Sequence, residues 1–376
     1  MKLKLFILLI SIFTLLPAFG KQSTKNPLDV KYTVESYGTD PGASPEEVRA
    51  RLAALPAEIE MRYTDEVQRY INRYMKNGRR EIASLIALSS YYLPIFEDAL
   101  AGAGLPDELK YLPVIESKLN AKATSNRGAA GLWQFMPVAA RGYDMKISST
   151  IDERRDIYIS SDRACRMLQD LYKKFGDWGL ALAAYNAGPG TVQKALKRAG
   201  GDPKKHTFWT VKSYLPSQTQ HYVPHFIAIN YVMNYYTHHN ISEVRVEKPI
   251  STDTIHVAQQ TSVSKIASEL NVDASDIKAL NPQLKADVIP ASASRPCIIV
   301  LPEAPARDYK IAMGRTPKAK AAPAANSTAS ARSAKKPATK VSSDDFIDVP
   351  SQVSPNTYVR VRRSEAAAGE RRRRRK

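Results

Sequence analysis

Helical periodicity without strand-like alternation is the feature that most constrains the fold of this chain. Up to residue 240, apolar side chains recur at helical spacing and no window shows sustained alternation of apolar and polar residues. Ser44 offers an N-cap, with a proline at N1 and two acidic residues after it. A longer helical pattern covers residues 79–103 and ends at Gly104. We therefore expect a mostly α-helical domain over residues 44–244.

The composition changes just after this domain, where shorter stretches replace the long helical pattern. Strands are expected over residues 255–258 and 297–301, and two short helices lie between them, over 264–270 and 274–280. This order predicts a small βααβ module within residues 250–302.

The chain after Pro302 is rich in Ala, Pro, Lys, Ser and Thr and has few large apolar side chains to offset the entropy of ordering. Residues 303–376 carry 18 basic and 7 acidic side chains. Their net charge of +11 is most of the net charge of +18 of the whole chain. We expect a disordered basic tail. Attraction to an anionic envelope surface fits its terminal run, residues 371–376, better than nucleic acid does, because no aromatic residues interleave to stack bases. A merely solvated tail is the alternative.

The N-terminus resembles a secretory signal. Lys2 and Lys4 precede an uncharged apolar run, and small residues stand at the cleavage positions near Gly20. We expect a signal peptide over residues 1–20, a linker over 21–43, and a protein exported to the periplasm or cell envelope. No cysteine near the cleavage site could carry a lipoprotein anchor, and an uncleaved N-terminal anchor is the alternative.

The chain contains two cysteines, Cys165 and Cys297, which fall in different predicted modules. A structural disulfide framework is therefore not indicated. We expect two buried thiols, although a bridge between docked modules stays open.

Glu116 is the candidate for acid–base chemistry. It follows the apolar run Leu112-Pro113-Val114-Ile115, near the end of a helix expected to begin at Asp107. A carboxyl group in apolar surroundings is costly to ionise, so its pKa should rise and it can hold a proton near neutral pH. A general acid that protonates a leaving sugar oxygen needs this property.

The residues that follow carry groups suited to a sugar. Ser125, a glycine-rich turn over residues 128–131, Trp133 and Gln134 lie between Glu116 and the next acid. Glycines let backbone approach a ligand, aromatic faces stack on pyranose rings and amides pair with N-acetyl groups. Polar and aromatic residues recur in two further clusters, Ala184-Tyr185-Asn186-Ala187-Gly188 and Gln218-Thr219-Gln220-His221-Tyr222-Val223-Pro224. Each aromatic residue, taken alone, also fits an ordinary core position.

These motifs, in this order, resemble the catalytic domain of the soluble-lytic-transglycosylase family, glycoside hydrolase family twenty-three, in the branch of membrane-bound lytic murein transglycosylase D. The resemblance covers residues 43–240 and rests on Glu116-Ser117, on Gly131-Leu132-Trp133-Gln134 preceded by Ser125, and on the two later clusters. It implies a goose-type lysozyme-like helical fold with a deep groove.

The resemblance also implies roles for individual residues. Glu116 would be acid and base, and Ser125 a hydroxyl partner close to the reacting carboxyl group. Gln134 and Asn186 would contact N-acetylated sugars. Tyr185 and Tyr222 would line the cleavage point.

The count of carboxylates separates two mechanisms. The usual glycosidase routes need a second carboxylate, and none can be assigned, because residues 152–156 alternate in charge like a salt-bridged helix start. The resemblance implies cleavage of the MurNAc-GlcNAc β-1,4 bond of peptidoglycan without water or cofactor. The substrate's own acetamido group would stabilise the charge, and Glu116 would assist closure of a 1,6-anhydro ring. A hydrolytic muramidase and a non-catalytic peptidoglycan-binding scaffold are the alternatives.

The histidines give no metal site. His221 and His225 are four apart, as ligands on a helix would be, but Pro224 interrupts the turn and no glutamate accompanies them in the sequence. We expect no metal, and a monomeric protein.

Residues 253–302 resemble a degenerate LysM domain, a glycan-binding βααβ unit. Asn281-Pro282 and the closing apolar strand match, whereas Gln259-Gln260-Thr261-Ser262 replaces the expected Gly-Asp-Thr. Glycan binding and a purely packing role for this LysM-like module both stay open.

Overall fold

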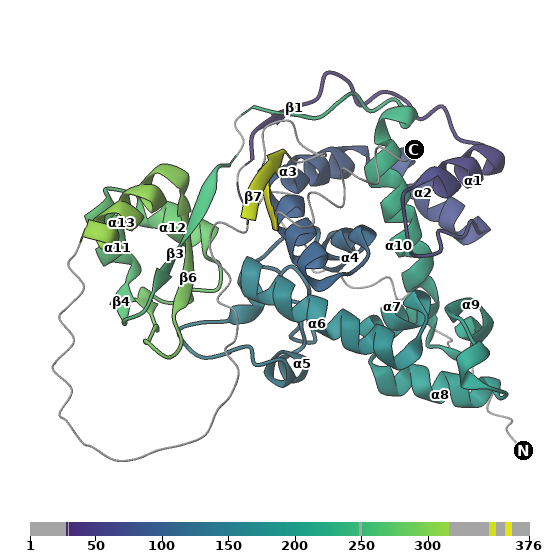
Figure 1. Ribbon diagram of the computed structural model, residues 1–376. Helices are drawn as coiled ribbons and strands as arrows, with labels where there is room; N and C mark the ends of the chain where they lie inside the picture. Colours follow the sequence, from purple (N-terminus) through teal and green to yellow (C-terminus); the bar gives the residue numbers. More distant parts are fainter. Residues whose placement is uncertain (1–27, 29, 248–249, 316–345, 351–357, 363–376) are drawn as a thin grey trace, which may run out of the picture. The chain divides into compact units, whose positions relative to one another are not determined.

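A computed structural model describes residues 28, 30–247, 250–315, 346–350 and 358–362 (Figure 1). The predicted signal peptide and the terminal basic run lie outside these residues. Within them, no helix combines the length and the apolar character needed to cross a membrane.

The helical domain confirms the predicted mostly α fold class. Its α-helices are α1 (Pro45–Ala54), α2 (Asp65–Asn77), α3 (Arg79–Ala103), α4 (Leu112–Ser117), α5 (Pro137–Gly142), α6 (Ile157–Phe175), α7 (Trp178–Ala187), α8 (Pro189–Ala199), α9 (Phe208–Val211) and α10 (Ser217–Tyr235). Short 3₁₀ helices are η1 (Asp107–Tyr111), η2 (Glu153–Arg155), η3 (Pro203–Lys205), η4 (Lys212–Tyr214) and η5 (Tyr236–His239).

Local signals set several helix ends. The Ser44 hydroxyl accepts a hydrogen bond from the Glu47 N–H and the Glu47 carboxylate accepts one from the Ser44 N–H, which forms a capping box at α1. Gly104 ends α3 with a φ of 64°, a left-handed conformation in which glycine carries no steric penalty. Both ends lie where the sequence placed them.

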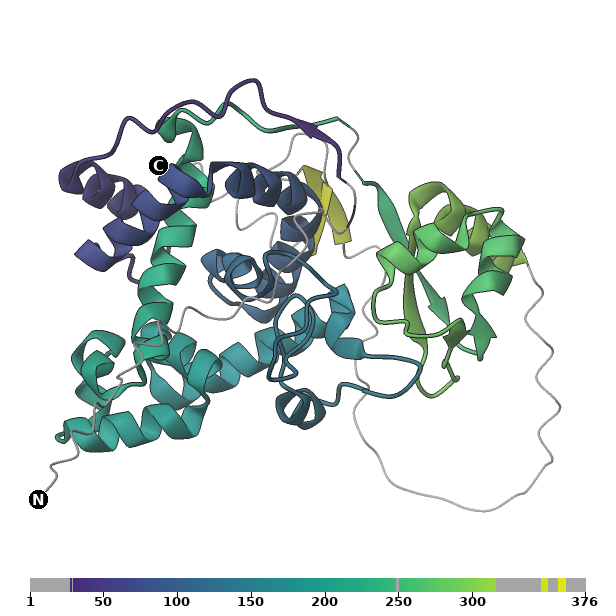
Figure 2. The ribbon, with the colours of Figure 1, turned by 180° about the vertical axis from the view of Figure 1, so that it is seen from behind.

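Helix α10 runs through the centre of the domain. It packs against α2 and α7, and both views of the ribbon show it passing these helices in turn (Figure 2). Helix α6 packs against α3 and α7. The largest fully buried side chains of this core are Trp133, Tyr231, Phe96, Phe208 and Phe226.

The segment expected to be a linker is packed from residue 30 onward. Strand β1 (Tyr32–Thr33) pairs antiparallel with β2 (Arg245–Val246), and Val30 is buried in the main core. The Arg79 guanidinium donates to the Tyr37 carbonyl oxygen at 2.5 Å and to the His239 carbonyl oxygen at 2.6 Å. These contacts join the two ends of the helical domain. The sequences of the two ends are short and polar and did not indicate that the ends would pair.

The LysM-like module has the predicted βααβ order. Strand β3 (Thr252–Val257) pairs antiparallel with β6 (Cys297–Pro302), and α11 (Val263–Leu270) and α12 (Ala274–Leu280) lie between them in the chain. A minor pair of strands consists of β4 (Thr261–Ser262) and β5 (Val288–Ile289).

Helix α13 (Glu303–Arg315) follows the module where the disordered tail was expected to begin. Ala306 is fully buried in the module's core and Tyr309 packs against it. One buried alanine and one tyrosine therefore anchor a segment whose composition alone indicates a solvated tail. Further along the chain, β7 (Phe346–Pro350) pairs antiparallel with β8 (Tyr358–Arg362).

Candidate active site

Glu116 lies on α4, the one-and-a-half-turn helix that follows η1. Its neighbours Leu112, Val114 and Ile115 are buried, and Glu116 itself keeps only intermediate exposure. Burial raises the pKa of the Glu116 carboxyl group to about 7, because the charged form loses hydration there. The carboxyl group can therefore hold a proton at neutral pH and release it again, as the sequence predicted.

Tyr222, on α10, donates a hydrogen bond from its hydroxyl group to Oε1 of Glu116 at 2.5 Å. This bond lowers the Glu116 pKa and so opposes part of the effect of burial. Burial, and then the nearby Glu116 charge, raise the pKa of the Tyr222 hydroxyl group well above its usual value. Tyr222 is thus held neutral, as a hydrogen-bond donor to the carboxylate.

Tyr185, on α7, completes a cluster from three helices. Its hydroxyl group donates to the Trp133 carbonyl oxygen at 2.7 Å. Burial, followed by the charge of Glu116, raises the Tyr185 pKa well above its usual value. The structure therefore brings Glu116, Tyr185 and Tyr222 together, and the roles of the two tyrosines at a cleavage point stay a prediction.

The loop after α4 is shaped by residues in left-handed conformations. Gly128 and Gly131 have φ values of 82° and 83°, and Gln134 has a φ of 50°. A Cβ atom on Gly131 would lie 1.7 Å from the carbonyl oxygen of Arg154, so only glycine fits against this backbone. Isolated β-bridges join Ala130 to both Thr124 and Phe135 and close the loop on itself.

The other predicted sugar contacts make local hydrogen bonds. The Gln134 amide nitrogen donates to the Gly131 carbonyl oxygen at 2.8 Å, and the Thr219 hydroxyl donates to Oδ1 of Asn186 at 3.1 Å. Ser125 is exposed, and its Oγ accepts from the Ala129 N–H at 3.0 Å. The hydrogen bonds found for Ser125 thus serve its own turn, and its predicted closeness to the reacting carboxyl group stays a prediction.

Trp133 is a core residue. Its indole ring is fully buried, packs edge-on against Phe96 at a centroid distance of 5.3 Å, and donates from Nε1 to Oγ of Ser161 at 2.9 Å. The expectation that this aromatic face stacks on a sugar is wrong, because its surface is covered by protein. The Trp133 contribution to the cluster is its backbone carbonyl group, which binds Tyr185.

The acids at residues 152–156 have structural partners. Asp152 pairs with the Arg154 guanidinium at 2.8 Å, and the Asp156 side chain accepts from two backbone N–H groups as the N-cap of α6. Burial raises the pKa of Asp156 to about 7. The prediction of a salt-bridged helix start is confirmed.

Glu66 is the neighbour of His221 that the sequence did not reveal. Its carboxylate contacts Nδ1 of His221 and lies 2.5 Å from Nζ of Lys212. His225 receives a different partner, the Tyr74 hydroxyl group, at 2.6 Å, and burial lowers the His225 pKa to about 4. Among the described residues, no group of three His, Cys, Asp or Glu side chains could hold a metal ion.

Cys165 and Cys297 are both free and buried.

Comparison with protein families gives two matches. Residues 94–208 match the family described as "Transglycosylase SLT domain". Residues 251–313 match the family described as "Lytic transglycosylase MltD, LysM-like domain". The second match includes most of α13, in agreement with the packing of that helix on the module.

Similar proteins include membrane-bound lytic murein transglycosylase D of Escherichia coli strain K12, which is 28% identical over 276 residues. That alignment covers 73% of this chain and 60% of the relative, so the chain spans less than two thirds of the length of the relative. A protein of Alteromonas sp. strain M-1, described as a putative tributyltin chloride resistance protein, is 43% identical over 93 residues, which is 24% of this chain and 45% of that protein. The 70 kDa soluble lytic transglycosylase of Escherichia coli is a solved structure with 21% identity and a TM-score of 0.35, covering 56% of this chain and 38% of that one.

Proposed function

Because the chain carries a transglycosylase SLT domain and a LysM-like domain of the lytic transglycosylase MltD type, we propose that it is a peptidoglycan lytic transglycosylase. It cleaves the β-1,4 bond between MurNAc and GlcNAc and leaves a 1,6-anhydro-muramyl end. The observation that supports this most is the Glu116 carboxyl group, whose pKa is raised by burial to about 7 and which accepts a hydrogen bond from Tyr222.

In the first step, protonated Glu116 gives its proton to the bridging oxygen as the bond from that oxygen to C1 of the muramyl residue breaks. The carbonyl oxygen of the substrate's 2-acetamido group bonds to C1 and takes up the positive charge. Glu116 is left as a carboxylate, which the Tyr222 hydroxyl group stabilises by its hydrogen bond.

In the second step, the Glu116 carboxylate takes the proton of the muramyl 6-hydroxyl group. The 6-oxygen bonds to C1 as the acetamido oxygen leaves, which closes the anhydro ring and restores protonated Glu116. A group that donates and then accepts a proton works best with a pKa near the working pH, and burial gives Glu116 such a value. Ser125, Gln134, Tyr185 and Asn186 are assigned to substrate binding around this step.

The products of digestion test the proposal. Purified sacculi are digested with the protein and the soluble fragments are weighed by mass spectrometry. We expect anhydro fragments, each lighter by one water than the product of hydrolysis. Fragments of the hydrolytic mass would identify a muramidase, and binding to sacculi without any release would identify a scaffold.

Two variants make this test specific for Glu116. Glu116→Gln keeps the size and an acceptor for Tyr222 but cannot give a proton, so fragment release should fall by about a thousandfold or more. Glu60→Gln makes the same change at an exposed glutamate paired with Arg62 and should leave release unchanged. Full lytic activity of the Glu116→Gln protein would refute the mechanism.

The place of action follows from the substrate. Peptidoglycan lies outside the cytoplasm, so the proposal requires export to the periplasm or the cell envelope. The charge of the C-terminal residues would add attraction to anionic envelope surfaces. Cell fractionation measures whether the protein is exported, and fractionation of a chain without residues 371–376 measures the attraction to the envelope surface.

A further inference from the structure

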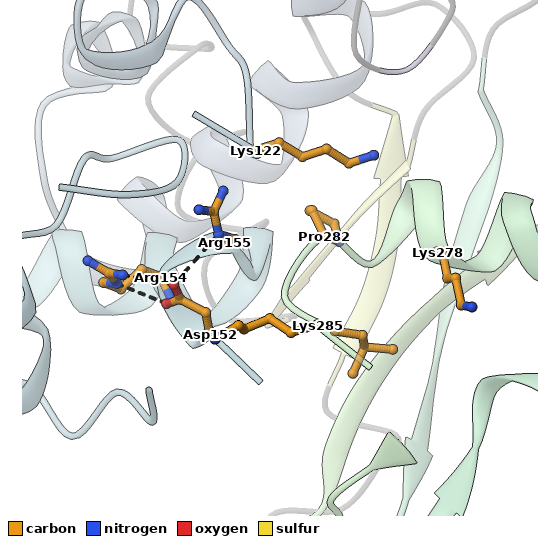
Figure 3. A pocket seen from close by; sticks show the side chains of 8 residues that line it. Lys122, Asp152, Arg154, Arg155, Lys278, Pro282 and Lys285 are labelled. Carbon is orange, nitrogen blue, oxygen red and sulfur yellow. Dashed lines mark hydrogen bonds and ion pairs between the residues drawn. The ribbon is translucent and has the colours of Figure 1, made fainter. Parts of the chain in front are cut away.

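A cavity of about 620 Å³ lies between the helical domain and the LysM-like module (Figure 3). We call it the seam pocket; it is lined by Lys122, Asp152, Arg154, Arg155, Lys278, Pro282, Leu284 and Lys285. It does not contain Glu116, Tyr185 or Tyr222, so it is separate from the candidate active site.

Backbone hydrogen bonds hold the two sides of the seam pocket together. The Asp152 N–H donates to the Gln283 carbonyl oxygen at 2.8 Å, and the Lys285 N–H donates to the Thr150 carbonyl oxygen at 2.9 Å. Between them, Ile151 is buried within the apolar core of the module. The pocket is therefore a product of specific docking within one compact unit of the chain.

The seam pocket is strongly cationic. Five lysine and arginine side chains line it against one carboxylate, and that carboxylate, Asp152, is occupied by the guanidinium of Arg154. Lys278 lies 3.8 Å from an Asp287 oxygen and both side chains are about half exposed. The Lys122 ammonium group makes no hydrogen bond or ion pair with any other residue that the structure describes, and its backbone N–H donates to Oδ1 of Asn120 at 2.9 Å. A concave surface with such an excess of positive charge attracts anions.

The floor of the seam pocket also supports the loop that leads from Glu116 to Gln134. The Arg155 guanidinium donates to Oγ1 of Thr124 at 2.6 Å. The Arg154 guanidinium donates to the carbonyl oxygens of Gly128 at 2.7 Å and Phe135 at 3.2 Å. The loop that begins after Glu116 therefore connects the seam pocket with the proposed cleavage site.

We infer that the seam pocket binds the carboxylate groups of a peptide stem on the peptidoglycan strand. This inference rests on the proposed function, because that function makes peptidoglycan the polymer that reaches this surface. On a strand with attached stems, the lactyl carboxyl group of each muramyl residue is bound in the amide bond to the stem, so the free carboxylates lie on the peptide stems. The pocket would hold one stem while a nearby bond is cut.

Binding of an isolated tripeptide stem tests the inference without any cleavage. Calorimetric titration of the full chain compares a stem with free carboxylates and the same stem with amidated carboxylates. We expect the free stem to bind about tenfold more tightly, because two exposed charge pairs each contribute up to roughly fivefold. Lys122→Gln combined with Lys278→Gln should abolish this difference.

A matched pair of substitutions serves as the control. Lys173→Gln and Lys265→Gln also remove one exposed lysine from the helical domain and one from the LysM-like module. The ion pairs are matched as well, because Lys265 lies 3.9 Å from Glu269 and Lys278 lies 3.8 Å from Asp287. This control should retain the preference for the free stem. Thermal unfolding checks that both double variants fold as the original chain does.

Three results would overturn the inference. The first is equal binding of free and amidated stems, and the second is a control variant that loses the preference for the free stem as the Lys122 and Lys278 double variant does. The third is displacement of the stem by inorganic phosphate at equal concentration, which would mark a general anion site. Failure of the proposed function would show itself separately, as the absence of anhydro fragments from sacculi. Stem binding measured by calorimetry does not depend on that result.

Discussion

Tyr222 and Glu116 are 106 positions apart in the chain, yet the hydroxyl group of the first lies 2.5 Å from Oε1 of the second. Helix α10 packs on α4 and so delivers the donor to the carboxyl group. The donor favours the ionised carboxylate and burial favours the protonated form, so the Glu116 pKa of about 7 is the balance of two opposed effects. Each effect can be removed separately.

Removal of the donor should move the pH profile. In Tyr222→Phe only burial acts on Glu116, so its pKa rises, and the alkaline limb of kcat/KM for fragment release moves upward by about one to two pH units. Tyr185→Phe is the control, because the Tyr185 hydroxyl group binds the Trp133 carbonyl oxygen and not Glu116. An alkaline limb that stays in place in Tyr222→Phe would show that the hydrogen bond does not tune the acid.

Replacement of Glu116 by glutamine should change how stability depends on pH. The folded-state pKa is about 7 and the unfolded value is 4.5, so the carboxyl group stabilises the fold most below pH 4.5 and loses this contribution as the pH rises through 7. Glutamine does not titrate. Relative to the original chain, Glu116→Gln should therefore gain of the order of 1–3 kcal/mol between pH 4.5 and pH 8.

Urea unfolding at several pH values measures this difference directly. Asp156 titrates in the same window, but it is present in both proteins and cancels in the comparison. Exposed Glu60→Gln should show no such trend. A stability difference that is the same at pH 5 and pH 8 would mean that Glu116 is ionised in the folded state at both.

Docking of the LysM-like module can be tested at Arg295. Its guanidinium donates to the carboxylate of Glu153 at 2.8 Å and to the Asp144 carbonyl oxygen at 3.0 Å. The Glu153 side chain is only 6% exposed, so Arg295→Gln leaves a buried carboxylate without its cation and should cost about 1–3 kcal/mol. The exposed Arg245–Glu35 pair is the reference, where Arg245→Gln should cost less than about 1 kcal/mol. Thermal unfolding that ranks the two variants equally would show that the Arg295 contacts add nothing.

The sequence predicts most reliably what neighbouring residues decide. The cap at Ser44, the end of α3 at Gly104 and the βααβ order each depend on residues within one or two turns of each other. The raised pKa of Glu116 also belongs to this class, because the apolar residues beside it in the sequence indicated a buried position, and these residues are buried in α4.

Contacts between distant residues could not be predicted in this way. Glu66 and His221 are 155 positions apart, and nothing near either residue indicates the other. The pairing of β1 with β2 likewise joins the two ends of the helical domain through short polar segments. Trp133 was misassigned for a related reason: the motif places it beside sugar-binding groups, but its neighbour Phe96 comes from α3.

Glycine 131 gives the sharpest test of the loop between Glu116 and Gln134. Gly128 and Gly131 have nearly equal φ values, 82° and 83°, so alanine meets the same left-handed strain of about 1–2 kcal/mol at either position. At Gly128 nothing lies within 4 Å of the added Cβ atom, whereas at Gly131 that atom would lie 1.7 Å from the Arg154 carbonyl oxygen. Gly131→Ala must displace the Arg154 backbone and should cost roughly 3–5 kcal/mol in all, as measured by urea unfolding. Because Arg154 also binds the Gly128 and Phe135 carbonyl oxygens, fragment release should fall even at a temperature where the variant stays folded. Equal losses in Gly128→Ala and Gly131→Ala would mean that the backbone contact with Arg154 does not hold the loop in place.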